Sequence, residues 1–170
     1  MLLKSKKEVM IKDLEGVIKN SESLVFVNFH GLKVSDETIL RRNLREQEVG
    51  YKVSRKTLLR RALEGKAEGE IPELAGEVAI AYLPAKALAS AGSKDGTIVP
   101  REIYNFQKTH KGILNIIGGI FEGKFLDAKK MMEIAMIPSR EVLYAQFVNL
   151  INSPIQRLAV VLDAIAKGRD

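Results

Sequence analysis

The chain has 170 residues, with 27 Lys or Arg against 21 Asp or Glu, which gives a formal net charge of +6. Its 46% hydrophobic and 28% charged residues are typical of a folded globular protein rather than a disordered one. The absence of Cys excludes a disulfide framework, a Cys-based zinc site and a thiol nucleophile. The sequence contains no run of about 18 uninterrupted apolar residues, so we expect no membrane span. The N-terminal stretch MLLKSKKEVM is too short and too polar for a secretory signal.

Apolar residues follow helical and strand spacings in alternation through the first 136 residues. Ser5 is expected to cap a helix over 6–19, and Ser35 a second helix that ends before Gly50. Residues 65–76, rich in Gly and Glu, are expected to form an exposed connection. The other predicted helices cover 55–64, 84–91, 100–110 and 127–136. The predicted strands cover 23–29, 51–53, 77–83 and 112–121, with a hairpin extension at 125–126.

This alternation predicts an α/β or α+β domain over residues 1–136, in which helices cover a mixed sheet. Gly118 and Gly119 lie inside a strand pattern, which indicates a β-bulge or a close approach of two backbones. Pro138 interrupts the pattern, because proline disfavours a helical residue before it, and Ser139 can cap a new helix after it. Residues 137–170 are therefore expected to form a separate, protruding helical segment.

The C-terminal segment is unusually apolar. Of the 25 residues from Val142 to Ala166, 17 are apolar and only Arg157 and Asp163 are charged. The sequence Ser-Pro-Ile-Gln at 153–156 has the form of a helix start, which predicts two helical pieces, 140–152 and 154–167, joined at a hinge or kink.

Three interpretations of this segment are open, because a helix that is apolar on most sides must be buried on most sides. It can be the centre of the chain's own core, although its terminal position and the Pro138 break argue against that. It can lie on a membrane, although it lacks the basic polar face of such helices. It can dock into an apolar groove of a partner, which we favour.

Positive charge is concentrated near the N-terminus, because residues 1–66 carry 15 basic and 9 acidic side chains and residues 67–170 carry 12 of each. This asymmetry indicates either a solvated basic surface or a face that binds a polyanion, most simply nucleic acid. Few aromatic residues accompany the basic ones, which favours a folded RNA recognised by shape and backbone. We expect a continuous positive face formed by the candidate RNA-binding residues Lys6, Lys7, Lys33, Arg41, Arg42, Arg45, Lys52, Arg55, Lys56, Thr57, Arg60 and Arg61.

Catalytic motifs are missing from the sequence. The two histidines, His30 and His110, have no accompanying nucleophile motif, and there is no phosphate-binding glycine-rich loop. No metal-ligand spacing stands out either. We therefore expect no enzymatic activity, no metal, no cofactor and no small-molecule substrate.

Several segments in order resemble the bacterial family of large-subunit ribosomal protein ten, whose members form the base of the ribosomal stalk. Each segment is weak evidence alone, but their ordered combination along nearly the whole chain is specific. The matching segments are Phe29–Val34, Leu40–Arg45, Tyr51–Val53, Thr57-Leu58, Gly118-Gly119, Glu122–Lys124, Leu126–Ala128 and Pro138–Glu141.

The resemblance implies that residues 1–136 bind the GTPase-associated region of the large ribosomal RNA, next to ribosomal protein eleven. It implies that residues 137–170 anchor dimers of the acidic stalk protein, which recruit translation factors, on a ribosome in the cytoplasm. We expect two dimers, because the apolar stretch 155–166 is short. The candidate residues for stalk-protein binding are Ile155, Leu158, Val161, Leu162 and Ile165.

A competing hypothesis is a free-standing RNA-binding assembly or regulatory factor that forms homodimers through its C-terminal helix. The oligomeric state of the purified chain distinguishes the two, since a stable homodimer favours this competitor.

Overall fold

A computed structural model describes residues 4–66, 71–84, 96–110 and 113–168. The chain divides into two compact units, Met1–Ile137 and Pro138–Asp170. The predicted helix 84–91 lies outside the described residues except for Pro84. The helices of the first unit are α1 (Lys4–Lys19), α2 (Val34–Glu46), α3 (Lys56–Leu63), α5 (Ile98–Thr109) and α6 (Ala128–Ala135). Its strands are β1 (Ser21–Asn28), β2 (Gly50–Val53), β3 (Val78–Pro84), β4 (Asn115–Phe121) and β5 (Lys124–Asp127).

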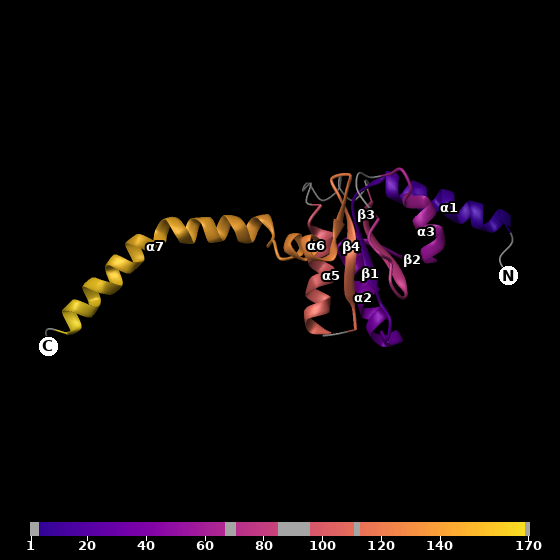
Figure 1. The fold of residues 1–170 in the computed structure, drawn as a ribbon. Coiled ribbons are helices and arrows are strands. Elements are labelled where there is room, and N and C mark those ends of the chain that lie inside the picture. Colours follow the sequence, from indigo (N-terminus) through magenta and orange to yellow (C-terminus); the bar gives the residue numbers. More distant parts are fainter. Residues whose placement is uncertain (1–3, 67–70, 85–95, 111–112, 169–170) are drawn as a thin grey trace. The chain divides into compact units, whose positions relative to one another are not determined.

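The strands form one five-stranded sheet in the order β2-β3-β1-β4-β5 (Figure 1). The expected α+β architecture is confirmed, but the expected mixing of strand directions is wrong, because all four neighbouring pairs are antiparallel. β1, α2 and β2 form a unit with two strands of the same direction, as the alternation suggested. β3 lies between those two strands and runs opposite to both, so they never pair with each other.

Helices cover both faces of the sheet (Figure 1). Along β1, Val25 and Val27 join a core cluster that contains Leu40 of α2, together with residues of α5 and α6. The alternate residues Leu24 and Phe26 join a second cluster with α1 and α3. This period-two alternation is the signature of a sheet buried on both faces. We call the two sides the α2 face, covered by α2, α5 and α6, and the α3 face, covered by α1 and α3.

The glycine pair in β4 produces both of the features expected from the sequence. The pairing of β1 with β4 shifts register between Phe26 and Val27, so Ile117 is skipped in the ladder. At Gly119, an added Cβ would lie only 2.3 Å from the Leu24 carbonyl oxygen and 2.4 Å from the methyl of Met131. β1 and α6 therefore pack directly against the bare backbone of β4.

Helix α2 begins earlier than expected and ends before Gly50, as expected. Lys33, not Ser35, is the N-cap residue, because the Glu37 N–H donates to the Lys33 carbonyl at 3.0 Å and closes the first turn two residues earlier. At the other end, Glu48 adopts the left-handed conformation with φ 57°. The Val49 N–H donates to the Leu44 carbonyl at 2.8 Å, which completes a Schellman motif and turns the chain into β2. Ser5 likewise lies inside α1 rather than before it.

The second unit consists of helix α7 (Arg140–Lys167), with Ser139 as its N-cap residue as expected. The separate helix start predicted at Pro154 is wrong, because Pro154 lies inside one continuous helix, whereas the kink expected between the two pieces is confirmed (Figure 1). Proline removes one N–H donor and crowds the preceding turn, which bends a helix without necessarily ending it; Figure 1 shows α7 bent about midway. Within the described ranges, no helix is long and apolar enough to cross a membrane.

Candidate functional site

The twelve candidate RNA-binding residues lie in two groups on opposite faces of the sheet. Lys33 precedes α2, and three arginines lie on that helix. The remaining residues lie on α1 and around α3, apart from Lys52 in the edge strand β2. The single continuous positive face expected from the sequence is therefore wrong in that form, because α2 packs on the other face of the sheet from α1 and α3.

Two of the three arginines of α2 form ion pairs with acids of the same helix. The Arg41 Nη2 lies 2.6 Å from Glu37 Oε1, and its guanidinium lies 5.4 Å from the centre of the Tyr51 ring. Arg42 pairs with Glu46 at 3.4 Å. Burial raises the pKa of Tyr51 to about 12, with a smaller rise from the nearby Glu37 charge and an opposing effect of Arg41. These exposed ion pairs orient the guanidinium groups but contribute little stability.

The charges around α3 are free of such pairing. Arg55, Lys56, Thr57, Arg60 and Arg61 are exposed, whereas the next helical positions inward are buried. Among the described residues, none of these basic side chains forms an ion pair with an acid. A polyanion can approach them without displacing an internal carboxylate.

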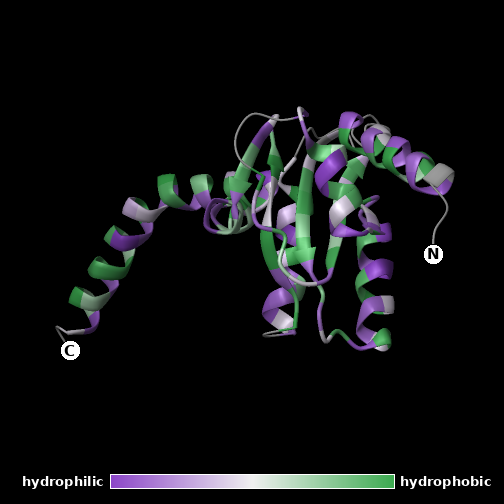
Figure 2. Ribbon diagram, turned by 45° about the vertical axis from the view of Figure 1, so that its right-hand side comes forward, coloured by the Kyte–Doolittle hydropathy of each residue, from purple (hydrophilic) through white to green (hydrophobic). Residues whose placement is uncertain are grey.

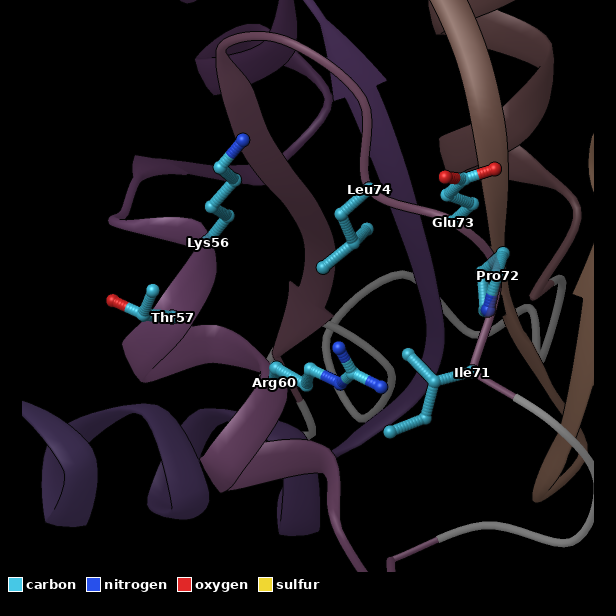
Figure 3. Close-up of a pocket in the computed structure, with 7 residues that line it drawn as sticks. All are labelled: Lys56, Thr57, Arg60, Ile71, Pro72, Glu73 and Leu74. Atoms are coloured by element: carbon cyan, nitrogen blue, oxygen red, sulfur yellow. The ribbon is translucent and has the colours of Figure 1, made fainter.

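A pocket of about 520 Å³ opens beside α3. Lys56, Thr57 and Arg60 line one side, and residues 71–74 line the other (Figure 3). The expected exposed connection is thus wrong for Ile71 and Leu74, which are partly buried against the core cluster of the α3 face. The sequence reasoning missed this wall, although three apolar residues in a stretch rich in Gly and Glu are a signal of packing.

Helix α7 presents all five candidate stalk-protein-binding residues to solvent. Their exposed fractions range from 53% at Val161 to 68% at Ile155, and α7 contains no buried residue. The helix is therefore not the centre of the chain's own core, which removes one of the three interpretations. Figure 2 shows hydrophobic residues along its whole length.

Neither histidine lies in a catalytic arrangement. His30 is exposed, with Nδ1 at 3.8 Å from Glu77 Oε2. His110 stacks on Phe106, with ring centres 4.3 Å apart. In the part of the chain that the structure describes, no cluster of His, Asp or Glu has the grouping of a metal site.

Comparison with known proteins accounts for both units. The family model described as Ribosomal protein L10 matches residues 2–93, which contain all twelve candidate RNA-binding residues. The model of the ribosomal protein uL10 C-terminal region matches residues 137–169, which contain α7.

Relatives named large ribosomal subunit protein uL10 match along nearly the whole chain. The protein of Albidiferax ferrireducens is 36% identical over 168 residues, 99% of this chain and 89% of the relative. The protein of Alkaliphilus metalliredigens is 35% identical over 162 residues, 94% of this chain and 91% of the relative. The protein of Clostridium acetobutylicum is 33% identical over 166 residues, 96% of this chain and 92% of the relative.

These matches define the class as a non-enzymatic structural protein of the large ribosomal subunit. The chain belongs to the ribosomal protein uL10 family, as its ordered motifs predicted.

Proposed function

We propose that this chain is the base of the ribosomal stalk. In this proposal, residues 1–136 bind the GTPase-associated region of the large-subunit RNA, and residues 137–170 anchor dimers of the acidic stalk protein. The observation that carries the proposal is the full exposure of α7, a 28-residue helix without one buried side chain.

Exposure on this scale requires a partner. Leu150, Ile155 and Leu158 are 68%, 68% and 61% exposed, and other large apolar side chains continue on every side of the helix. Contiguous apolar surface of this kind marks an interaction site in a soluble assembly. An apolar helix that enters a groove formed by partner helices buries such a surface from several sides at once.

The two halves of α7 support a stoichiometry of two dimers. Pro154 separates an apolar stretch at 142–151 from a second at 155–166. The second stretch contains the stripe Ile155, Leu158, Leu162 and Ile165, with Val161 beside it. At about 1.5 Å per residue, the two stretches are about 15 and 18 Å long, and the proposal assigns one dimer to each.

The RNA end of the proposal is supported by the exposed cations around the β2 edge. Arginine can hold a phosphate with two hydrogen bonds, and lysine supplies a point charge. Because the two basic groups lie on opposite faces of the sheet, an RNA that contacts both must pass over the edge strand β2, where Lys52 lies. A folded RNA that presents backbone on two sides fits this arrangement better than a straight duplex.

The same proposal includes ribosomal protein eleven as a neighbour and a ribosome-bound position in the cytoplasm. Family membership supports ribosome association.

The docking end is tested with Leu158→Asp combined with Leu162→Asp. Two buried, unpaired carboxylates in an apolar interface prevent docking, so we expect isothermal titration calorimetry to detect no binding of the acidic stalk protein. The matched control is Asn149→Asp with Gln156→Asp, which adds the same charge to the same helix at polar positions and is expected to retain binding. If stalk-protein binding survives the double leucine substitution, the docking helix is misplaced.

The RNA end is tested with Arg60→Ala combined with Arg61→Ala. We expect weaker binding to the RNA fragment and a salt dependence flatter by about two counterions, measured by filter binding across a range of KCl concentrations. The control is Lys129→Ala with Lys130→Ala, two exposed cations on α6 outside the proposed site. An unchanged salt slope in the arginine variant would remove these residues from the RNA interface.

A further inference from the structure

The pocket beside α3 joins two kinds of surface that a simple phosphate-binding face does not need. One side carries Lys56 and Arg60, one helical turn apart on α3. The other side is a wall formed by Ile71, Pro72 and Leu74. Figure 3 shows the Arg60 guanidinium extending across toward Ile71, whereas the Thr57 side chain points away from this wall.

The apolar wall is fixed by the fold. Ile71 and Leu74 pack against the core cluster of the α3 face. Pro72 lies over the bare backbone of β4, where an added Cβ on Gly118 would come within 3.1 Å of its ring and 2.6 Å of the Leu126 carbonyl oxygen. The glycine that forms the β-bulge therefore also makes room for the wall. A preformed wall of this kind loses little freedom when a ligand binds.

The cationic side is available for a ligand. Lys56 and Arg60 are exposed and have no acidic partner among the described residues. Among the described residues that line the pocket, Glu73 is the only acid, and it lies on the opposite side from the two cations (Figure 3). A ligand with one anionic end and one flat, largely apolar end matches this division, and the pocket volume of about 520 Å³ falls in the range of small-ligand sites.

We propose that this pocket receives a single unstacked nucleotide of the bound RNA. Its phosphate lies at Lys56, and its base lies between the plane of the Arg60 guanidinium and the wall formed by Ile71, Pro72 and Leu74. Bases that leave the stack in loops and bulges are commonly held on arginine planes or aromatic rings, and flipped-out bases are also held between apolar side chains. This inference rests on the proposed RNA-binding function and adds to it a defined nucleotide site.

Contacts to the base and contacts to the phosphate have different effects. Loss of a base contact lowers the affinity without changing its salt dependence, whereas loss of a phosphate contact also makes the salt dependence flatter. Arg60→Lys keeps the charge and removes the plane. Leu74→Ser removes part of the wall and no charge. For both variants we expect about a tenfold loss of affinity for the GTPase-associated RNA fragment with an unchanged salt slope, from the loss of about 50 Å² of apolar contact. Lys56→Ala is expected to flatten the slope by about one counterion instead.

The matched control is Ile11→Ser. Ile11 packs against the same core cluster as Leu74 but does not line the pocket, so it reproduces any loss of stability without changing the wall. Full affinity in Ile11→Ser and reduced affinity in Leu74→Ser assign the loss to the wall. Equal affinity in Arg60→Lys, Leu74→Ser and the wild-type chain overturns the nucleotide pocket. In that case, a flatter salt dependence of RNA affinity in Lys56→Ala still supports the proposed RNA-binding function. An unchanged salt dependence removes Lys56 from the RNA interface too.

A second measurement uses the unmodified chain and does not depend on any variant folding. A set of RNA fragments, each with one abasic site in an unpaired region, is titrated against the wild-type protein. We expect one position where loss of the base costs the wild-type chain about tenfold in affinity. Uniform affinity across all abasic positions contradicts the proposal.

Discussion

The two units of this chain are both rich in apolar residues, but the first unit buries a large apolar core, whereas α7 contains no buried residue. In the first unit, Phe26, Leu59 and Ile80 are fully buried between the sheet and its helices. In α7, Phe147, Leu158 and Leu162 are 63%, 61% and 58% exposed. The difference shows that apolar residues form an internal core in the first unit and an exposed surface on α7, which is the surface of the proposed docking.

The same substitution, leucine to alanine, is expected to have very different effects on stability in the two units. Leu59→Ala removes a fully buried side chain and is expected to lower the free energy of unfolding by about 2–5 kcal/mol. Leu158→Ala removes an exposed side chain and is expected to change it by less than about 0.5 kcal/mol. Urea denaturation followed by circular dichroism measures both. A large loss in Leu158→Ala would show that α7 is packed within the chain.

A second prediction concerns the close approach of β1 and α6 to β4. Gly119→Ala places a methyl group against the Leu24 carbonyl oxygen and Met131, so we expect the free energy of unfolding to fall by about 3 kcal/mol. Gly16→Ala is the matched control, because Gly16 lies inside α1 with nothing within 4 Å of an added Cβ. The free energy of unfolding of this control is expected to rise by about 0.5–1 kcal/mol, because alanine has a higher helix propensity than glycine. Equal stability of the two variants in thermal denaturation would contradict the packing described for β4.

The third prediction uses the left-handed residue that ends α2. Glu48→Gly relieves the strain of φ 57° in a residue with a side chain and is expected to stabilise the first unit by about 0.5–1 kcal/mol. Glu46→Gly, two residues earlier and still inside the helix, is expected to destabilise it by about 1 kcal/mol. If urea denaturation shows that the free energy of unfolding rises in Glu48→Gly and falls in Glu46→Gly, the Schellman motif is supported. Changes of the same sign in both variants argue against it.

At neutral pH the smallest effect on stability is expected at Tyr51, because its contribution changes only as the pH approaches 10 and above. Because folding raises the pKa of Tyr51 from 10.0 to about 12, the folded state holds its proton more tightly than the unfolded state. The stability from this group is complete below pH 10 and falls as the pH rises toward 12. Tyr51→Phe removes this part of the decline. A decline equally steep in both proteins would show that Tyr51 titrates normally in the fold.

The order and type of most elements followed from the sequence, because local spacing determines them. The apolar periodicity of α2 and α3, the β-branched run of β1 and the glycine pair of β4 each depend on near neighbours in the chain. The concentration of basic residues at one end and the apolar character of α7 were also visible in composition alone.

What the sequence could not provide depends on contacts between distant segments. The insertion of β3 between β1 and β2 made the sheet fully antiparallel, and no local pattern specifies that order. The same sheet placed α2 and α3 on opposite faces and so divided the basic residues into two groups. Leu74 looked like part of a polar connection because its packing partners lie elsewhere in the chain. Pro154 looked like a helix start because Ser-Pro-Ile-Gln is a local N-terminal pattern. The helix continues because the cost of one lost hydrogen bond is smaller than that of ending α7.

Native mass spectrometry of this chain, co-expressed with the acidic stalk protein of the same organism, tests the central claim most directly. We expect a complex of one copy of this chain with four copies of the partner, which corresponds to two dimers on the exposed helix. Six partner copies would correct the stoichiometry and keep the adaptor function. Free chain, or a homodimer of this chain without the partner, would contradict the claim that α7 is exposed in order to anchor the stalk.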